Sequence, residues 1–445
     1  MSWAPAGWVG VGESDGRWFS LLCCVVLSVI GVAPCGIAAM QPLTVSAGFE
    51  GASVASVEID QTARSIGFMP GGDPARGWPC WWYFRVDGVT PGETLTLRLR
   101  ASPATVATPG AALYRPLDPK WAMPARATCS SDGRTWGHTG RGARDGEWMV
   151  YTVRSTGASL HVAWGPPYTP SQAMAFLREI SRPLPWAEVT TLCHSREGRA
   201  VPVLRVSEGE PGRRQRFGVW VQARQHAWES GSTWVAHGFV EWLLGGGEDA
   251  RWLRRHAEIF VVPIMDIDNT ARGHGGKDAQ PHDHNRDWSD RPHWNETAAA
   301  QRKIQTLIEE GRMDVFLDLH NPAPGEPTFF FALHSDHVAA PVIALRNRFI
   351  ELSYLHISRA IPVLPMSREP RFIGAANNPR WRTFSNHWVS LNGNPQTVSL
   401  CLETAWDGPS GTSEGYRAVG SNLAAAVREY LGERLRSASV PFSKP

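Results

Sequence analysis

The hydrophobic and polar positions divide the chain into two parts. Between about Leu43 and Trp164, short runs alternate apolar and polar residues and are separated by Gly and Pro, as in TLTLRLR (94–100). Comparable runs occupy 54–59, 81–89, 149–154 and 159–164. A period of two is that of half-buried antiparallel strands. The pattern therefore predicts an all-β sandwich domain over residues 43–165.

Beyond the Pro-rich junction GPPYTP (165–170), continuous apolar runs alternate with helical stretches. Strands are expected at 216–223, 258–265, 314–320, 328–333 and 397–403, and helices at 171–180, 233–244, 297–310, 338–351 and 414–436. Buried strands separated by helices are typical of a mixed or parallel sheet with helices on both faces. The expected fold is an α/β catalytic domain over 170–437 preceded by the sandwich, with the chemistry on loops at strand ends.

The composition excludes several classes of protein. The 445 residues are 42% hydrophobic and include 21 Trp, which is ample for large buried cores and excludes a disordered chain. Lys and Arg (44) nearly balance Asp and Glu (42), and no long run carries one sign. We therefore expect no nucleic-acid partner held through phosphate contacts. The 15 His are a generous supply for metal chemistry.

One segment has the character of a membrane or export signal. Residues 18–40 are uncharged and mostly apolar, and small residues at 36, 38 and 39 suit signal-peptidase cleavage. Residues 1–39 are thus expected to be a signal peptide, which gives a secreted or periplasmic protein without stable membrane association after processing. The flank lacks net positive charge, which leaves two alternatives. Either translation starts at Met40 and the protein is cytoplasmic, or the segment is a retained anchor.

Four cysteines lie outside this segment, at Cys80, Cys129, Cys193 and Cys401. None forms a C-x-x-C pair, so neither a zinc ribbon nor a redox motif is indicated. Buried free thiols are expected, with a Cys80–Cys129 bridge as the alternative for an exported protein.

The pattern His-x-x-Glu occurs three times, and two of the occurrences have ordinary structural explanations. His194 and Glu197 surround a predicted hairpin turn. His293 and Glu296 open a predicted helix, where an acid near the N-terminus suits the helix dipole. Neither pair is expected to bind metal.

The third pair, His226 and Glu229, directly follows an apolar strand and precedes a helix. A sharp turn at a strand end can aim both side chains at one point, and a second strand delivers His320. Two imidazoles and one carboxylate, with a position left for water, form the catalytic zinc pattern. A core histidine beside an unrelated buried acid is the alternative. His282 and His284 lie on a polar loop and are expected to support or flank the site rather than to bind metal.

Four motifs in order carry a family resemblance: RQHAWE (224–229), DHNRDW (283–288), DLH (318–320) and LCLET (400–404). Together they resemble the M14 family of zinc carboxypeptidases. The N-terminal sandwich is similar to that of the cytosolic-carboxypeptidase-like branch. The resemblance covers roughly residues 43–435.

The resemblance implies that His226, Glu229 and His320 bind one Zn²⁺ and that Glu403 is the general base. It also implies that Asn285 and Arg286 hold the terminal carboxylate of the substrate. A guanidinium suits this task because it grips a carboxylate through two parallel hydrogen bonds. In the same family pattern, Asp283 orients a zinc-bound imidazole, here that of His226.

Two positions depart from the family pattern. The family places an Arg before the Asn-Arg pair to stabilise the oxyanion, and here Lys277 aligns best, with Arg272 as second choice. The family often has a Tyr about twenty residues before the base, but this chain has none between Tyr354 and Glu403. Trp381 or Phe384 are the aromatic residues available to fill that space.

The sequence therefore predicts a zinc metallocarboxypeptidase whose substrates are the C-termini of peptides or proteins. Arg380 and Arg382 are candidates for a basic pocket that favours acidic terminal residues, with solvated surface arginines as the alternative. Two further alternatives stay open: a zinc amidohydrolase acting on N-acyl amino acids, and a degenerate peptidase that acts as a binding module.

Overall fold

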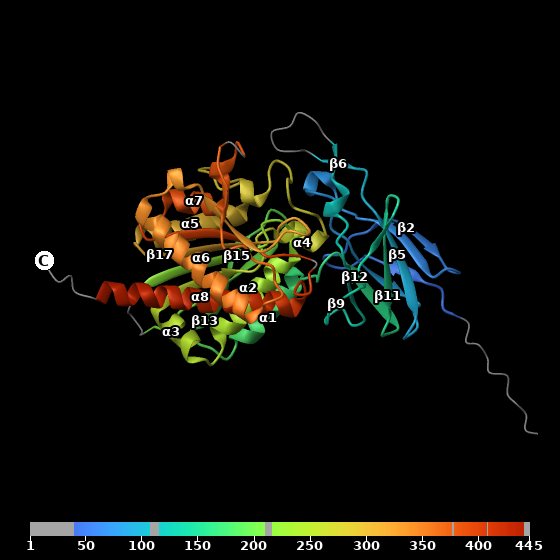
Figure 1. Ribbon diagram of the computed structural model, residues 1–445, viewed down its shortest axis with the longest axis horizontal. Coiled ribbons are helices and arrows are strands. Elements are labelled where there is room, and N and C mark those ends of the chain that lie inside the picture. The colour runs from blue at the N-terminus through green and yellow to red at the C-terminus, as the bar shows by residue number, and fades with distance from the viewer. Residues whose placement is uncertain (1–39, 107–114, 210–215, 376–377, 407, 440–445) are drawn as a thin grey trace, which may run out of the picture. The chain divides into compact units, whose positions relative to one another are not determined.

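The computed structural model describes residues 40–106, 115–209, 216–375, 378–406 and 408–439 (Figure 1). The predicted signal peptide lies outside these residues, so export, a start at Met40 and a retained anchor all stay predictions. Within the described ranges, no helix combines the length and the hydrophobicity needed to span a membrane.

The N-terminal part consists of two five-stranded sheets. One has the order β1 (Thr44–Ser46), β4 (Tyr83–Asp87), β12 (Ser159–Ala163), β8 (Thr128–Ser130), β9 (Gly137–His138). The other has the order β10 (Ala143–Asp145), β11 (Trp148–Arg154), β5 (Thr94–Arg100), β3 (Ser65–Met69), β2 (Ala55–Asp60). The ring of Phe68 from the second sheet contacts Trp82, which directly precedes β4, and Phe84 of β4 at centroid distances of 5.1 and 4.8 Å. The predicted sandwich is confirmed.

The C-terminal part is built on one eight-stranded mixed sheet. Its order is β13 (Ala187–His194), β14 (Ala200–Val206), β16 (Ala257–Val262), β15 (Phe217–Ala223), β17 (Met313–His320), β20 (Val398–Glu403), β18 (Phe329–Leu333), β19 (Arg371–Ile373). Strands β16, β15, β17 and β20 are parallel, so their carboxyl ends meet at one edge of the sheet. That edge carries the ends of the strands that lead to His226, His320 and Glu403.

Helices cover both faces of this sheet, as predicted (Figure 1). One layer contains α2 (Ser230–Leu244), α3 (Glu248–His256), α6 (Ala340–Ala360) and α8 (Ser413–Ser439), and the other α5 (Asn295–Glu309) and α7 (Ser385–Asn392). In β15, Val219 and Val221 belong to the core under the first layer, and Trp220 belongs to the core under the second. A strand buried on both faces explains why its sequence is a continuous apolar run.

Helices α2 and α8 cross at a backbone-to-backbone contact. A Cβ added to Gly420 would lie 1.9 Å from the carbonyl oxygen of Val235, and one added to Gly238 would lie 2.0 Å from that of Arg417. Only glycine permits this approach, which brings α8 close against α2, the helix that follows the turn of His226 and Glu229.

Several predicted boundaries were wrong for local reasons. Strand β16 ends at Val262 rather than at residue 265, because Pro263 has no backbone N–H to donate to the sheet. Helix α6 runs nine residues beyond its predicted end. The polar loop after β16 contains an unpredicted short helix, α4 (Ile267–Arg272), which Asp266 caps by accepting a hydrogen bond from the backbone N–H of Asn269.

All four described cysteines are free thiols, so the alternative Cys80–Cys129 bridge does not form. Cys80 and Cys401 are buried, and burial raises the pKa of both thiols. These two positions agree with the expectation of inert buried thiols.

Candidate metal centre and substrate clamp

A sharp turn after β15 positions the first two candidate ligands. Arg224 has a positive φ of 64° and redirects the chain immediately after the strand. Its buried guanidinium donates hydrogen bonds to the carbonyls of Ala227 and Tyr168 at 2.7 and 3.0 Å. Helix α2 then begins at Ser230. The turn between strand and helix therefore carries His226 and Glu229 on a backbone fixed at both ends.

His226, Glu229 and His320 converge in the interior. Nδ1 of His226 lies 2.8 Å from Oε1 of Glu229, and Nδ1 of His320 lies 2.7 Å from Oε2. The three residues are at most 2% exposed, and one ligand atom from each lies within 4.8 Å of the others. The arrangement brings together two imidazole nitrogens and one carboxylate, which are the donor types that Zn²⁺ takes in catalytic sites.

The outer nitrogen of each imidazole faces a second carboxylate. Nε2 of His226 lies 3.5 Å from Oδ1 of Asp283, and Nε2 of His320 lies 2.9 Å from Oδ2 of Asp318. A carboxylate on the outer nitrogen favours the tautomer with its proton there, which leaves the Nδ1 lone pair directed inward. The side chains thus fit a zinc ion at the point where both Nδ1 atoms and Glu229 meet.

Asp318 is a site residue that the sequence analysis missed. It lies on β17, two residues before His320, and strand alternation puts both side chains on one face of the sheet. It is fully buried and also accepts hydrogen bonds from Nε2 of Gln225 and Oγ of Ser385. An acid inside a mostly apolar strand, two residues before a proposed ligand, was the available signal.

The charges in this cluster shift one another's protonation. Burial raises the pKa of Glu229, but the neighbouring His226 and His320 outweigh burial and hold it well below its usual range. Burial also lowers the pKa of His320, yet the carboxylates of Asp318 and Glu229 raise it well above the ordinary value. The pocket therefore strongly favours positive charge between its carboxylates.

Glu403 ends strand β20, directly beside His320 in the β17–β20 register. Burial raises the pKa of Glu403 to about 7, with the Glu229 charge acting in the same direction and the His320, Lys277 and His226 charges opposing it. A carboxylate with this pKa, next to a candidate metal centre, has the proton affinity that a general base needs near neutral pH.

The predicted clamp residues, Asn285 and Arg286, lie on the one-turn helix η3 (His284–Arg286), near the candidate metal ligands. Nδ2 of Asn285 is 3.4 Å from Nε2 of His320, and its Oδ1 accepts a hydrogen bond of 3.0 Å from the backbone N–H of Ser385. The guanidinium of Arg286 lies over the ring of Phe384 at 3.8 Å. Phe384 therefore packs against the clamp, whereas Trp381 stacks on His337.

The two oxyanion candidates have different surroundings. Arg272 is exposed and pairs with Oε2 of Glu197 at 2.6 Å. Lys277 lies near enough for its charge to act to lower the pKa of both Asp283 and Glu403. Its ammonium lies 5.2 Å from the centroid of the Trp78 ring.

The other two His-x-x-Glu pairs lie outside the cluster. Glu197 is on the predicted turn after β13 and forms ion pairs with arginines. Glu296 is in the first turn of α5, as predicted, but it is buried, with Oε2 3.7 Å from Nε2 of His284. Burial lowers the pKa of His284, but Asp266 and Glu296 outweigh burial and raise it to about 9. The expectation that Glu296 is a simple helix-end acid is therefore incomplete. His282 does not contact Glu296 in this way; its Nε2 donates a hydrogen bond of 2.6 Å to Oδ1 of Asp287.

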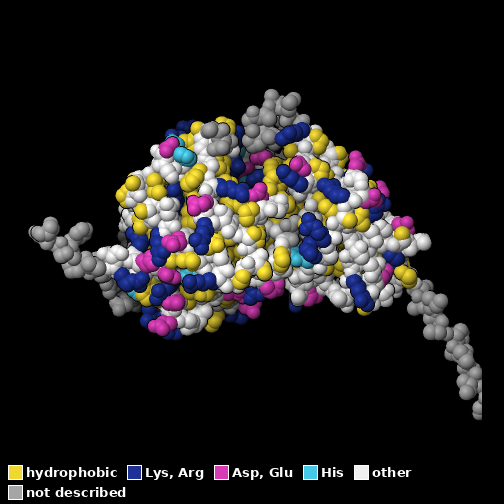
Figure 2. Space-filling model, viewed as in Figure 1, with side chains coloured by type: hydrophobic (Ala, Val, Ile, Leu, Met, Phe, Trp, Pro, Cys, Tyr) yellow, Lys and Arg dark blue, Asp and Glu magenta, His cyan; other side chains and the backbone are white. Residues whose placement is uncertain are grey.

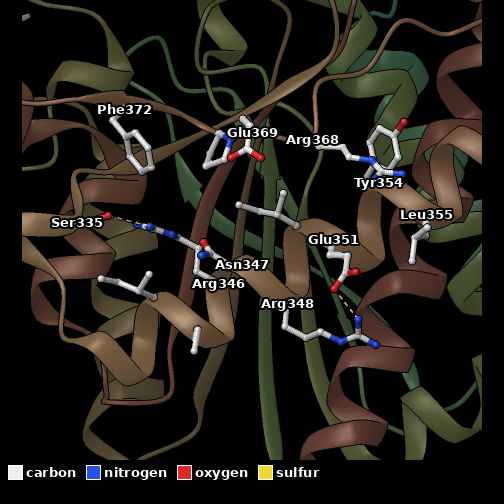
Figure 3. A pocket seen from close by; sticks show the side chains of 14 residues that line it. Ser335, Arg346, Asn347, Arg348, Glu351, Tyr354, Leu355, Arg368, Glu369 and Phe372 are labelled. Atoms are coloured by element: carbon white, nitrogen blue, oxygen red, sulfur yellow. Dashed lines mark hydrogen bonds and ion pairs between the residues drawn. The ribbon is translucent and has the colours of Figure 1, made fainter.

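A cavity of about 590 Å³ lies along α6, away from the candidate ligands (Figure 3). Tyr354, Arg368 and Glu369 contribute to its lining, and no predicted site residue does. Tyr354 thus cannot replace the tyrosine that the family places over its substrate. The side chains of Arg380 and Arg382 are exposed, and the latter lies over Trp381 at 4.5 Å.

Basic and acidic side chains are interspersed on the face of the molecule shown in Figure 2. Neighbouring basic and acidic side chains also form ion pairs, such as Arg348–Glu433 and Arg417–Glu241, both at 2.7 Å.

The fold is that of carboxypeptidase-like α/β proteins, and the comparisons with known proteins define it further. Residues 174–312 match the family described as zinc carboxypeptidase. Cytosolic carboxypeptidase 2 of Danio rerio is 27% identical over 277 residues, which are 56% of this chain and 37% of that protein. The predicted resemblance to the M14 family is confirmed, although the chain spans less than two fifths of the zebrafish protein.

Solved structures share the fold over most of the chain. A metallo-carboxypeptidase from Burkholderia cenocepacia has a TM-score of 0.72 at 22% identity, covering 88% of this chain and 100% of that one. A metallo-carboxypeptidase from Pseudomonas aeruginosa, in complex with (2-guanidinoethylmercapto)succinic acid, has a TM-score of 0.68 at 19% identity and covers 88% and 99%. The coverage extends over both the sandwich and the α/β part.

Proposed function

We propose that this protein is a zinc-dependent metallocarboxypeptidase that hydrolyses the last peptide bond of peptides or proteins. The observation that carries the proposal is the convergence of His226, Glu229 and His320 beside a strand-end acid, Glu403. The family match over residues 174–312 supports the same activity. One zinc ion per chain would be held by the two Nδ1 atoms and the Glu229 carboxylate.

The residues around this centre would divide the work of hydrolysis. When bound, zinc lowers the pKa of a coordinated water and polarises the scissile carbonyl. Glu403 accepts the proton of the attacking water and returns it to the nitrogen of the leaving amine. Its pKa of about 7 lets it act in both directions near neutral pH. Lys277 stabilises the negative charge that develops on the carbonyl oxygen.

Asn285 and Arg286 would make the enzyme an exopeptidase. Asn285 lies 3.4 Å from His320 and Arg286 follows it on the same helical turn, so a carboxylate bound by the pair would place the last peptide bond at the metal centre. The ring of Phe384 beneath the guanidinium fixes its plane, which keeps two N–H groups available for a bidentate contact. An internal peptide bond offers no carboxylate at this point and is bound less well.

An amidohydrolase that cleaves N-acyl amino acids is the second candidate. One observation favours it: no described residue supplies a phenol at the clamp, where Phe384 stands instead. A binding module without catalysis is disfavoured, because the ligands, the base and the clamp all meet at one edge of the sheet.

Mass spectrometry of a mixed peptide library incubated with the purified protein tests the proposal. We expect loss of single C-terminal residues, which disappears in Glu403→Gln and after chelation. A set of N-acyl amino acids, incubated in parallel, separates the amidohydrolase. An intact library with bound zinc would refute the carboxypeptidase, and an intact library without zinc binding would favour the binding module.

Arg286→Lys gives a sharper control for the clamp, because it keeps the charge and removes the fork. We expect KM for peptides to rise and zinc content to stay unchanged. Equal KM values for free and C-terminally amidated peptides in the unmodified protein would contradict the proposed role of the clamp.

A further inference from the structure

The loop that carries Lys277 is bonded to the N-terminal sandwich through its backbone. The N–H of Trp78 donates to the carbonyl of Lys277 at 3.0 Å, and the N–H of Gly276 donates to that of Arg76 at 2.9 Å. A third bond of 2.8 Å joins the N–H of Gln280 to the carbonyl of Ala75. The segment around η1 (Pro74–Arg76) thus acts like a pairing strand for a loop of the catalytic part.

Two glycines let the loop fit between the sandwich and the metal-ligand turn. A Cβ on Gly275 would lie 2.0 Å from the carbonyl oxygen of Trp78. A Cβ on Gly276, whose φ is +77°, would lie 2.5 Å from the backbone nitrogen of Ala227. The N–H of Trp228 also donates to the carbonyl of Gly275 at 3.0 Å. The loop is therefore in contact with the sandwich on one side and the ligand turn on the other.

The Trp78 side chain holds the end of this loop. The Lys277 ammonium lies 5.2 Å from the ring centroid, within the range of a cation–π contact. The indole Nε1 donates to Oδ2 of Asp278 at 3.0 Å, and the N–H of Asp278 donates to Oδ2 of Asp283 at 3.0 Å. Trp78 thereby touches both the candidate oxyanion residue and the residue next to it.

The aromatic contacts continue from the sandwich to the metal centre. Trp78 packs on Trp121 at a centroid distance of 4.7 Å, and Trp121 meets Trp228 edge-on at 6.0 Å. Trp164, at the end of the sandwich, contacts both Trp228 and Trp406 at 5.3 and 4.5 Å. Trp228 lies between the ligands of the turn, and Trp406 follows the base by three residues.

We propose that the sandwich completes the active site and that Trp78 is the positioning residue for Lys277. The inference rests on the proposed function, because it assumes that Lys277 stabilises the developing negative charge. A lysine ammonium is a point charge on a flexible chain, without the fixed fork of an arginine. The ring of Trp78 and the backbone hydrogen bonds restrict the flexibility of Lys277. Its ammonium is therefore held at the position where the family pattern has an arginine.

A kinetic double-mutant cycle tests this role. Loss of one oxyanion donor reduces kcat by about 10²–10³-fold, and we expect a loss of this order in Lys277→Ala. In Trp78→Leu we expect kcat to fall about tenfold, with KM and zinc content nearly unchanged. Adding Trp78→Leu to Lys277→Ala should then cost little more, because the group that Trp78 positions is already absent. Fully additive losses would overturn the proposal.

Trp148→Leu is the matched control. Trp148 is also a partly buried tryptophan of the sandwich and carries arginines over its ring at 5.1 Å, but it lies on β11 away from the interface with the loop. We expect its kcat to equal that of the unmodified protein. If Trp148→Leu lowers kcat as much as Trp78→Leu, the effect is one of general stability and the proposal fails.

A second measurement does not depend on catalysis. Competitive labelling with an amine reagent, quantified by mass spectrometry, gives the reactivity of Lys277 relative to Lys303, which lies on α5. We expect this ratio to rise in Trp78→Leu. It should change less in Trp78→Phe, because phenylalanine keeps an aromatic ring. The phenylalanine variant also keeps the test possible if the leucine variant does not fold. An unchanged ratio in both variants would overturn the positioning role. If the unmodified protein has no peptidase activity, the proposed function fails. The labelling ratio of Lys277 to Lys303 then still shows whether Trp78 positions the Lys277 side chain.

Discussion

Replacing Asp318 by Asn tests whether a carboxylate behind His320 sustains metal binding. Asp318 is fully buried, and its Oδ2 lies 2.9 Å from Nε2 of His320. The same oxygen accepts hydrogen bonds from Gln225 and Ser385. Asparagine has the same shape but no charge, so all three contacts lose their charge-assisted character while the space stays filled.

The expected loss follows from the hydrogen bond to His320. A hydrogen bond to a charged group contributes about 1.5–3 kcal/mol and a neutral one about 1 kcal/mol. The substitution therefore weakens this bond by about 0.5–2 kcal/mol, and 1.4 kcal/mol corresponds to about a tenfold change in affinity. We expect zinc to bind Asp318→Asn about tenfold more weakly, at the lower end of the roughly 10–100-fold typical for such partners.

Proton competition must be separated from this effect. Burial lowers the pKa of His320, but Asp318 and Glu229 raise it well above its ordinary value, so in neutral solution a proton competes with zinc for this side chain. Removing the Asp318 charge weakens that competition too. Zinc affinity should therefore be measured by competition with a fluorescent chelator over a pH series, and the comparison made on the alkaline plateau.

Asp314→Asn supplies the control on the same strand. Asp314 is also buried and lies at the opposite end of β17, where its Oδ1 accepts a hydrogen bond of 2.7 Å from Arg434. We expect its zinc affinity to equal that of the unmodified protein. Equal affinities for all three proteins, or equal losses in both variants, would refute the reasoning.

Three further predictions concern stability. In metal-free protein, the pKa of Glu403 is raised to about 7, so protonated Glu403 contributes stability that is complete below the unfolded-state pKa of about 4.5 and is lost as the pH rises through about 7. The free energy of unfolding, measured with urea, should fall as the pH rises across this window, and Glu403→Gln should remove this dependence on pH. The same pH dependence in both proteins would contradict the raised pKa of Glu403. Gly420→Ala should destabilise by about 3 kcal/mol or more because its Cβ would overlap Val235, whereas Gly432→Ala on the same helix has no contact nearer than 3.5 Å and should be neutral or stabilising. Thermal unfolding of the two variants decides this, and equal melting temperatures would argue against the close helix crossing. Gly276→Ala should be strongly destabilising, since φ is +77° and the Cβ would meet backbone, and a variant that unfolds like the unmodified protein would refute the tight fit of the loop.

The local part of the metal centre was predictable from the sequence. A continuous apolar run followed by a helical pattern places a turn at His226 and Glu229, and the structure has that turn between β15 and α2. His320 ends a second apolar run, and parallel strands end at the same edge. These predictions depend on short-range patterns, and the structure brings all three side chains together.

The neighbouring residues were harder to predict, because their roles depend on contacts between distant segments. Nothing in the spacing of Asp318 shows that Gln225 and Ser385 will donate to it. Lys277 and Arg272 lie five residues apart in one polar loop, and the sequence could not decide between them. In the structure Arg272 is the last residue of α4 and forms an ion pair with Glu197, and this observation supports the proposal of Lys277.

The sequence by itself determined the alternating strands of the sandwich, the buried strands of the α/β part and the donor chemistry of the candidate metal ligands. These properties depend on which residue types follow one another, and hydrophobic period and side-chain donors are both local. Only the tertiary structure decided that Trp78 of the sandwich meets the loop of Lys277. That contact joins segments about two hundred residues apart and depends on the close approach that Gly275 and Gly276 permit, which no local pattern records.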